Sequence, residues 1–583
     1  MSTFKSNNKL HINYMYLLML FISCYSLVRC FFETDLSDES YYVSEAITVL
    51  SGNTPLAYNT SLTSGMSFLI LPILFIVRIF NPEFTGIVLI LRICFTLFRF
   101  LLIFCISKLL YPDSMKDSCF LWIMVMIPYS AAINNQWSYN SISVWLLITS
   151  GALLCYSLDT KHPHSLLFCF LSGVLSCLCF FAHAFMAVSI LTQIVLLLIY
   201  VRKENGVYRF LLYSIGGLTQ ALLVFIGIMI SGGFSNICSG IETLINHPFE
   251  QSGSWKTQVK LCLQYFSKSL LMYFILFVLS VITVIVISKI KKKNTLIKHM
   301  LFEVAMLTLA LTCISHFFIN CKKVEWHFAG LIFLLTFAIC FFIKDCKSSM
   351  LFLGLPIIVF TAGEILFSYT NGPTTRFQFF IPLIIPILYM ADNISNKTLI
   401  RISAFSACSL VLLGSLRVYR DDELINLRYR VSDGVYKGLY TTEQRSQDLP
   451  EIERYIKTNT GKGVSVSFRD NVPFAYMMSN GTMCELSTWD CLQYTRGCNN
   501  PSNLYRYYMR KKSIPETIIY IDFGTDSKLS IDDTNYKYNS FINTYYTLTD
   551  KQTLNKTFFD VRKYELNSSI TYDDIDFESM LDE

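Results

Sequence analysis

The sequence predicts a polytopic all-α membrane protein of about 13 transmembrane helices, followed by a small C-terminal α/β domain. Of its 583 residues, 53% are hydrophobic and only 15% are charged, a composition typical of integral membrane proteins. Apolar stretches of about 20 residues, the length that crosses a bilayer, recur through the first part of the chain and then stop. We therefore divide the chain into a transmembrane module, 1–416, and a C-terminal domain, 417–583.

The two parts differ in charge. Residues 417–583 hold 21 Lys and Arg against 25 Asp and Glu, a balance of −4; subtraction from the totals of 48 and 42 leaves 27 and 17, or +10, for residues 1–416. The basic surplus lies mostly in short loops, as membrane orientation requires. It therefore gives no reason to expect a nucleic-acid partner.

The first apolar stretch, from about Ile12 to Phe32, follows two lysines and precedes no small-residue cleavage site. We expect an uncleaved first helix with a cytoplasmic N-terminus. The basic cluster from Lys289 to Lys293 is also placed in the cytoplasm. Alternating forward from it places the C-terminal domain outside the cytoplasm, after five predicted spans: Leu296–Ile319, Trp326–Ile343, Met350–Tyr369, Phe377–Met390 and Leu399–Leu416.

The earlier spans can be counted in two ways. If Ser64–Phe80 lies flat in the membrane interface, Ser165–Tyr200 must form a hairpin of two helices; if Ser64–Phe80 crosses, Ser165–Tyr200 is one helix. Both counts give the same total and place Asp38 outside. They differ on the side where Asn134–Asn140 emerges, and hydropathy leaves both open.

The first outer loop, 32–85, begins with an acidic segment. Ser37 is a typical N-cap, and Asp38 and Glu39 would occupy the first turn of a short helix, where they complement the helix dipole. A carboxylate there can accept a proton from a hydroxyl or an amine, or it can serve only as a cap. Helical spacing places four side chains on one face: Asp38, Tyr41, Tyr42 and Glu45.

Two separated motifs resemble those of GT-C glycosyltransferases, in particular the bacterial aminoarabinose transferases and the protein O-mannosyltransferases. The first motif is "DESYYVSEAITVLSG", and the second is "TTRFQFFIPLIIPILYMAD". The matching positions are Asp38, Glu39, Tyr42, Ala46, Gly52 and Pro55 in the first motif, and Arg376, Phe377, Pro382 and Pro386 in the second. The resemblance covers the architecture from about Leu10 to Leu416.

The resemblance implies transfer of a sugar from a polyprenyl-phosphate donor to a glycan, lipid or protein acceptor on the outer face of the membrane. Asp38 would then orient or deprotonate the acceptor, with Glu39 beside it. The family's flat helix would correspond to Ser64–Phe80. The chain departs from the family where many relatives carry a second acidic residue, because it offers only Asn140 there. A requirement for a divalent cation, Mg or Mn, is therefore left open.

Three basic residues in or next to the predicted spans are further candidates. Arg92 lies near the outer end of its helix and could hold the lipid phosphate of the donor, or could instead snorkel to the interface or pair with Glu364. Arg376 lies at the outer mouth of its helix and is expected to bind the donor phosphate; the alternative is an ordinary interfacial arginine. His183 lies at the hinge of the possible hairpin, either in the substrate cavity with Tyr42 and Asn140 or as a buried histidine.

The C-terminal domain alternates predicted helices and strands, which indicates an α/β fold. "DLPEIERYIKTN" reads as a helix with Pro450 in its first turn, and "NLYRYYMRKK" as another; "GVSVSF" and "ETIIYIDF" read as strands. Three cysteines, Cys484, Cys491 and Cys498, could supply one disulfide. The end, "TYDDIDFESMLDE", is expected to be a solvated acidic tail.

Two other functions remain open at this point. An envelope-polysaccharide polymerase or ligase would need a large outer loop rich in Arg and His, whereas Ser231–Lys268 has His247 and no Arg. A lipid or glycan transporter would show internal repeats and interrupted helices, and no clear repeat is visible.

Overall fold

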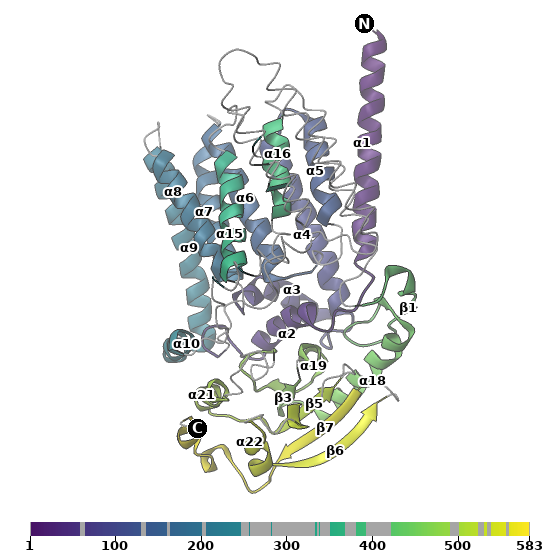
Figure 1. Ribbon diagram of the computed structural model, residues 1–583, viewed down its shortest axis with the longest axis vertical. Coiled ribbons are helices and arrows are strands. Elements are labelled where there is room, and N and C mark those ends of the chain that lie inside the picture. The colour runs from purple at the N-terminus through teal and green to yellow at the C-terminus, as the bar shows by residue number, and fades with distance from the viewer. Residues whose placement is uncertain are drawn as a thin grey trace.

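The computed structural model describes residues 2–58, 64–129, 136–159, 164–200, 206–246, 350–367, 380–391, 421–470, 472–489, 501–522, 530–532, 538–554 and 559–581, with isolated positions between 256 and 337. Most of the described transmembrane module is helical, and a small sheet lies in the C-terminal part (Figure 1). The predicted spans between 269 and 345 and between 399 and 416 lie outside these residues, apart from isolated positions. The total of 13 spans therefore stays a prediction.

Most of the described helices of the module run side by side in one bundle (Figure 1). They are α1 (Ser2–Arg29), α4 (Ile87–Leu110), α5 (Met115–Tyr129), α6 (Tyr139–Asp159), α7 (Ser165–Ala182), α8 (Ala187–Tyr200), α9 (Gly206–Gly232), α15 (Leu351–Phe367) and α16 (Ile384–Ala391). Four stretches are long and apolar enough to cross a membrane: Ile87–Leu110, Tyr139–Leu158, Ser165–Ala182 and Gly206–Gly232. Their length and composition indicate a membrane protein.

Close packing within the bundle depends on small residues. A Cβ added at Gly173 would lie 1.9 Å from the carbonyl oxygen of Tyr213, and one added at Gly216 would lie 2.1 Å from that of Phe170. Helices α7 and α9 can therefore approach only because both positions are glycine.

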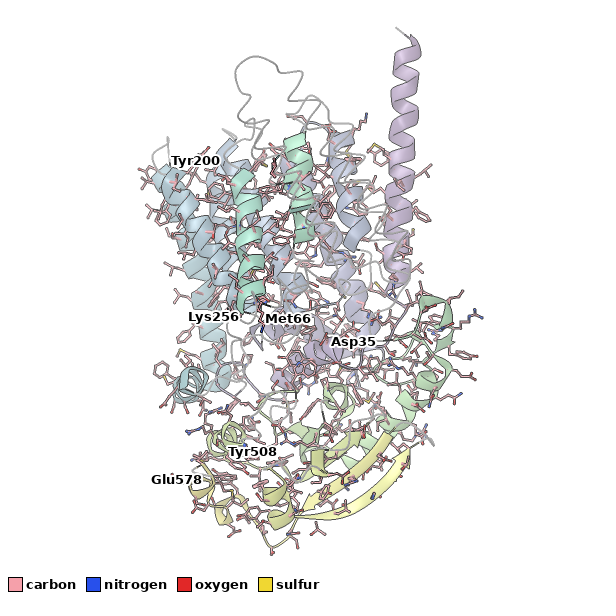
Figure 2. The ribbon with its side chains drawn as sticks, in the orientation of Figure 1. Asp35, Met66, Tyr200, Lys256, Tyr508 and Glu578 are labelled. Atoms are coloured by element: carbon pink, nitrogen blue, oxygen red, sulfur yellow. The ribbon has the colours of Figure 1, made fainter. Side chains whose placement is uncertain are left out.

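The stretch Ser165–Tyr200 breaks at His183 into α7 and α8, as the hairpin count requires. The 14 residues of α3 (Ser67–Phe80) rise roughly 21 Å, less than the hydrocarbon thickness. Helix α3 packs beside α2 (Asp38–Leu50) at the end of the bundle that faces the C-terminal sheet (Figure 1). Asp35 lies at this end and Tyr200 at the opposite one (Figure 2).

The C-terminal domain contains a five-stranded sheet of order β4-β3-β5-β7-β6. Strands β3, β4 and β5 are parallel, whereas β7 and β6 form an antiparallel hairpin at one edge. The strands are β3 (Ser465–Arg469), β4 (Thr482–Met483), β5 (Thr517–Asp522), β6 (Tyr546–Leu554) and β7 (Phe559–Leu566). A separate two-stranded pair, β1 (Tyr429–Arg430) and β2 (Tyr440–Thr441), precedes them.

Helices cover both faces of this sheet, because successive side chains of a strand point to opposite sides. Ile519 and Ile521 of β5 pack toward α18 (Glu443–Asn459) and α19 (Pro473–Met478), in the apolar core that continues through α2 into the bundle. Ile518 and Tyr520 pack toward a second, aromatic layer. Its helices are α21 (Ser502–Lys511), α22 (Tyr538–Tyr545) and α23 (Phe577–Leu581).

The predicted mixture of helices and strands in the C-terminal part is confirmed, as are both predicted strands and the helix over Ser502–Lys511. Three details differ. Helix α18 begins at Glu443, with the Thr442 side chain accepting from the backbone N–H of Arg445, so Pro450 lies inside the helix and not in its first turn. The hairpin β6-β7 was not predicted. The Cys484 thiol is buried and free, whereas Cys491 and Cys498 lie outside the described residues.

The expectation of a solvated acidic tail is wrong for the residues that the structure describes. Ile575 and Phe577 are buried in the aromatic layer, against residues of α21 and α22. The acidic side chains around them are exposed: Asp573, Asp574, Asp576 and Glu578. The acidic composition therefore concealed two apolar anchors. Glu578 lies at this edge of the domain (Figure 2).

Candidate functional site

The acidic segment forms the predicted helix, α2, but a different residue caps it. The Ser37 side chain makes no capping hydrogen bond. Instead, Asp35 Oδ1 accepts from the backbone N–H groups of Ser37 (2.9 Å) and Asp38 (3.2 Å), and its Oδ2 accepts from that of Glu39 (3.0 Å). A buried carboxylate thus satisfies three of the N–H groups at the start of α2. Asp35 stands three residues before the helix, so the sequence offers two capping residues, Asp35 and Ser37, and does not choose between them.

Glu39 is held by Arg92 in a buried ion pair. Arg92 Nε donates to Glu39 Oε1 at 2.7 Å, and its Nη2 donates to Oε2. The third nitrogen, Nη1, donates to backbone carbonyls of the segment after α1, the nearest being that of Phe32 at 2.8 Å. Burial raises the pKa of Glu39, and the adjacent guanidinium opposes that rise. Arg92 therefore pairs with Glu39 and not with Glu364, and all three of its nitrogens are bonded to protein.

Asp38 is placed differently from its two acidic neighbours. Its side chain is partly exposed, whereas those of Asp35 and Glu39 are buried. Tyr42 lies one turn further along α2 and is buried; burial raises the pKa of its hydroxyl well above the usual value, with smaller contributions from Tyr139 and Asp38. The Tyr42 side chain therefore stays protonated beside Asp38 and can donate a hydrogen bond there.

The candidate cavity residues meet through an aromatic chain that the sequence did not predict. The Tyr42 and Tyr139 rings lie 5.6 Å apart, and the Tyr139 and His183 rings lie 4.8 Å apart. His183 Nδ1 accepts from the Phe185 N–H, and its Nε2 lies 3.5 Å from Glu364 Oε1. Glu364, proposed above as a partner of Arg92, therefore faces His183.

Asn140 follows Tyr139 at the start of α6. Its Oδ1 is buried and has no hydrogen-bond partner among the described residues. A buried amide oxygen of this kind is an acceptor for a ligand hydroxyl, because leaving it unsatisfied costs free energy.

The C-terminal domain closes over α2. Glu45 Oε1 accepts from Ser487 Oγ (2.9 Å) and from the backbone N–H (2.8 Å) and Oγ1 (3.0 Å) of Thr488. The next residue, Trp489, packs on Tyr41 with ring centroids 5.3 Å apart. One wall of the region around α2 thus comes from a segment more than 400 residues away, which no local pattern could reveal.

A second buried carboxylate lies just before α2. Glu33 is 5% exposed and adopts a φ of +85°, in the left-handed region. Its N–H donates to the Tyr440 carbonyl at 2.9 Å, and its Oε2 lies 3.5 Å from Arg29 Nη2. Burial raises the pKa of Glu33 to about 8. Glu33 therefore joins α1 to the C-terminal domain, and its carboxyl holds its proton to higher pH than an ordinary glutamate does.

The carboxylates around α2 do not fit a metal site. Both oxygens of Asp35 are bonded to backbone N–H groups and both oxygens of Glu39 to Arg92. Across the described residues, no cluster of three or more His, Cys, Asp or Glu side chains is placed to hold a metal ion.

Of the candidate site residues, the structure brings Asp38, Glu39, Arg92 and Tyr42 together and connects Tyr42 to His183. Arg376 lies outside the described residues. Comparison with known proteins identifies no family: no protein-family model matches the chain, and no curated protein matches it.

Proposed function

We propose that the protein is a GT-C glycosyltransferase that transfers a sugar from a polyprenyl-phosphate donor to an acceptor at the membrane surface. The proposal includes about 13 spans, a cytoplasmic N-terminus and an extracytoplasmic C-terminal domain. It rests on the resemblance of the two motifs and on the geometry around α2.

The observation that carries the proposal is the position of Asp38. It is a partly exposed carboxylate in the first turn of a helix whose start is fixed by Asp35 and by the Glu39–Arg92 pair. The helix dipole favours its ionised form. A carboxylate held this rigidly can align a nucleophile. Such alignment contributes much of the rate enhancement of a displacement reaction.

In the proposed reaction, an acceptor hydroxyl donates its hydrogen bond, and then its proton, to Asp38. Its oxygen attacks the anomeric carbon of the donor sugar, while the bond from that carbon to the phosphate oxygen breaks. The electron pair leaves with the lipid phosphate, whose charge a cation must stabilise. We assign this role to Arg376 by resemblance and treat Arg92, which is bonded to Glu39, as a positioning residue.

The acceptor would bind between α2 and the C-terminal domain. Tyr42 and Asn140 offer a buried hydroxyl and a buried amide oxygen on one side, and Trp489 offers an aromatic face on the other. Such groups suit a sugar ring, which has polar edges and an apolar face. The acceptor itself could be a glycan, a lipid or a protein.

The test is sugar release from radiolabelled polyprenyl-phosphate sugars by purified protein in lipid nanodiscs. Asp38→Asn should lower turnover at least about a hundredfold, the scale of general-base catalysis, while donor binding persists. Asp113→Asn, at an exposed aspartate, serves as the control. Equal turnover in wild type and Asp38→Asn, or none with any donor, would reject the proposal and favour a transporter.

A further inference from the structure

A cluster of basic side chains lies where α21, α10 (Phe234–Asn246) and the loop after α2 meet. Arg506 and Arg510 are one turn apart on α21, and Lys511 follows. Arg510 Nη1 donates to Thr243 Oγ1 of α10 at 2.7 Å. Lys511 Nζ donates to the Gly52 carbonyl at 3.3 Å and lies 4.4 Å from the centroid of the Tyr58 ring.

No carboxylate that the structure describes balances this cluster. Within the described part of the chain, Arg506, Arg510 and Lys511 form no ion pair, and Glu242, beside Thr243, is exposed and does not reach them. Arg510 Nε and Nη2 and Arg506 Nε are buried without a hydrogen-bond partner among the described residues.

The pKa values of two of these groups, Arg510 and Lys511, are lowered. Burial lowers the pKa of the Arg510 guanidinium, and the nearby positive charge of Arg506 lowers it further. Burial also lowers the pKa of Lys511. Buried donors without partners cost free energy in a protein on its own. An anion would satisfy the unpartnered N–H groups of the two guanidinium groups and balance their charge and that of Lys511.

The surroundings indicate how such an anion would arrive. Helix α10 follows the long apolar helix α9 directly and lies at its foot (Figure 1). Phe234 and Ile241, seven residues apart on one face of α10, are 61% and 38% exposed. An exposed apolar face beside a basic cluster is the pattern of a helix in the membrane interface.

We propose that Arg506, Arg510 and Lys511 form a binding site for a phosphate group carried by a membrane lipid. The two guanidinium groups would donate the buried N–H groups described above to phosphate oxygens, for which their planar fork is suited. The acyl chains would lie along the apolar face of α10.

This site is separate from the one around Asp38. Gly52 and Asp38 stand at opposite ends of α2, whose 13 residues separate them by roughly 20 Å. The proposal does not depend on sugar transfer, and each can fail without the other.

Native mass spectrometry of the delipidated full-length protein in detergent tests this site. Dioleoyl phosphatidic acid, which carries a phosphomonoester, is compared with dioleoyl phosphatidylcholine. Wild type should retain the phosphatidic acid preferentially, and Arg506→Gln and Arg510→Gln should each lower retention at least about fivefold, or about 1 kcal/mol. Lys462→Gln removes one exposed positive charge elsewhere in the same domain and should behave as wild type.

Thermal unfolding without lipid provides the second readout. Because the partly buried Arg510 guanidinium has no ion-pair partner among the described residues, Arg510→Gln should leave the Tm unchanged or raise it. A lower Tm would mark Arg510 as structural and overturn the proposal, as would equal lipid retention in the variants. If millimolar inorganic phosphate stabilises wild type as much as phosphatidic acid does, the ligand is a soluble phosphate and the assignment to lipid is wrong.

Discussion

Glu39 and Arg92 form a buried, two-pronged ion pair that ties the first turn of α2 to helix α4. The two residues adjoin the partly exposed Asp38, so the pair fixes the orientation of the candidate catalytic helix. Buried pairs of this kind contribute little net stability, but breaking one leaves a charge without compensation.

We therefore expect Arg92→Met to destabilise the protein by about 3–5 kcal/mol. The double variant Glu39→Leu with Arg92→Met should recover most of that loss, because neither charge remains. Thermal unfolding in nanodiscs measures both. If the double variant were no more stable than Arg92→Met, the carbonyl contacts of Arg92 would be its main contribution.

The start of α2 gives a second prediction. Asp35→Ala removes a side chain that accepts three backbone N–H groups, so it should cost about 1–2 kcal/mol. Ser37→Ala should change the stability by less than half of that, because the Ser37 side chain makes no capping bond. Thermal unfolding of the two variants shows which residue caps α2. A larger loss of stability for Ser37→Ala than for Asp35→Ala would identify Ser37 as the cap, as the sequence predicts.

Asp35 and Ser37 also show which features of α2 could be predicted from the sequence and which could not. The helix itself followed from a capping residue and an acidic first turn, and those are local properties. The identity of the cap did not, because both Asp35 and Ser37 are good capping residues and the choice depends on the path of the chain after α1. The same holds for Arg92, whose partner could only be guessed among distant acidic residues.

In the C-terminal domain, too, local features could be predicted from the sequence and long-range contacts could not. Its buried strands β3 and β5 were predictable from short apolar runs, whereas the edge strand β6 is largely exposed and has no such run. The contact of Glu45 with Ser487 and Thr488 joins residues more than 400 positions apart. Long-range contacts of this type leave no trace in spacing or composition.

Glu33 gives a prediction for pH. Burial raises its pKa to about 8, from an ordinary value of 4.5, with Arg29 and Arg92 opposing the rise and Asp35 and Glu39 adding to it. The folded protein therefore keeps a proton that the unfolded chain has lost, and this contribution makes stability fall as pH rises from about 4.5 to about 8.

Replacing the side chain with a neutral isostere should remove that contribution. Glu33→Gln should show a flatter Tm profile than wild type between these pH values, and it should gain most relative to wild type near pH 8. Glu83→Gln, at an exposed position, is the control. A Glu33→Gln profile parallel to that of wild type would mean that another group titrates in this range.

The last turn of the chain gives the final prediction, because its acidic composition and its packing disagree. Phe577 is 4% exposed and packs on Tyr505, Tyr508 and Phe541. Phe577→Ala should therefore cost about 3–5 kcal/mol. A loss of 3 kcal/mol corresponds to about a hundredfold faster exchange of amides that open only when the domain unfolds. Hydrogen exchange of β5, read by mass spectrometry, measures it. Glu578→Ala, one residue away and exposed, should leave the exchange of β5 unchanged; an equal effect of both variants, or of neither, would show that the segment does not anchor the aromatic layer.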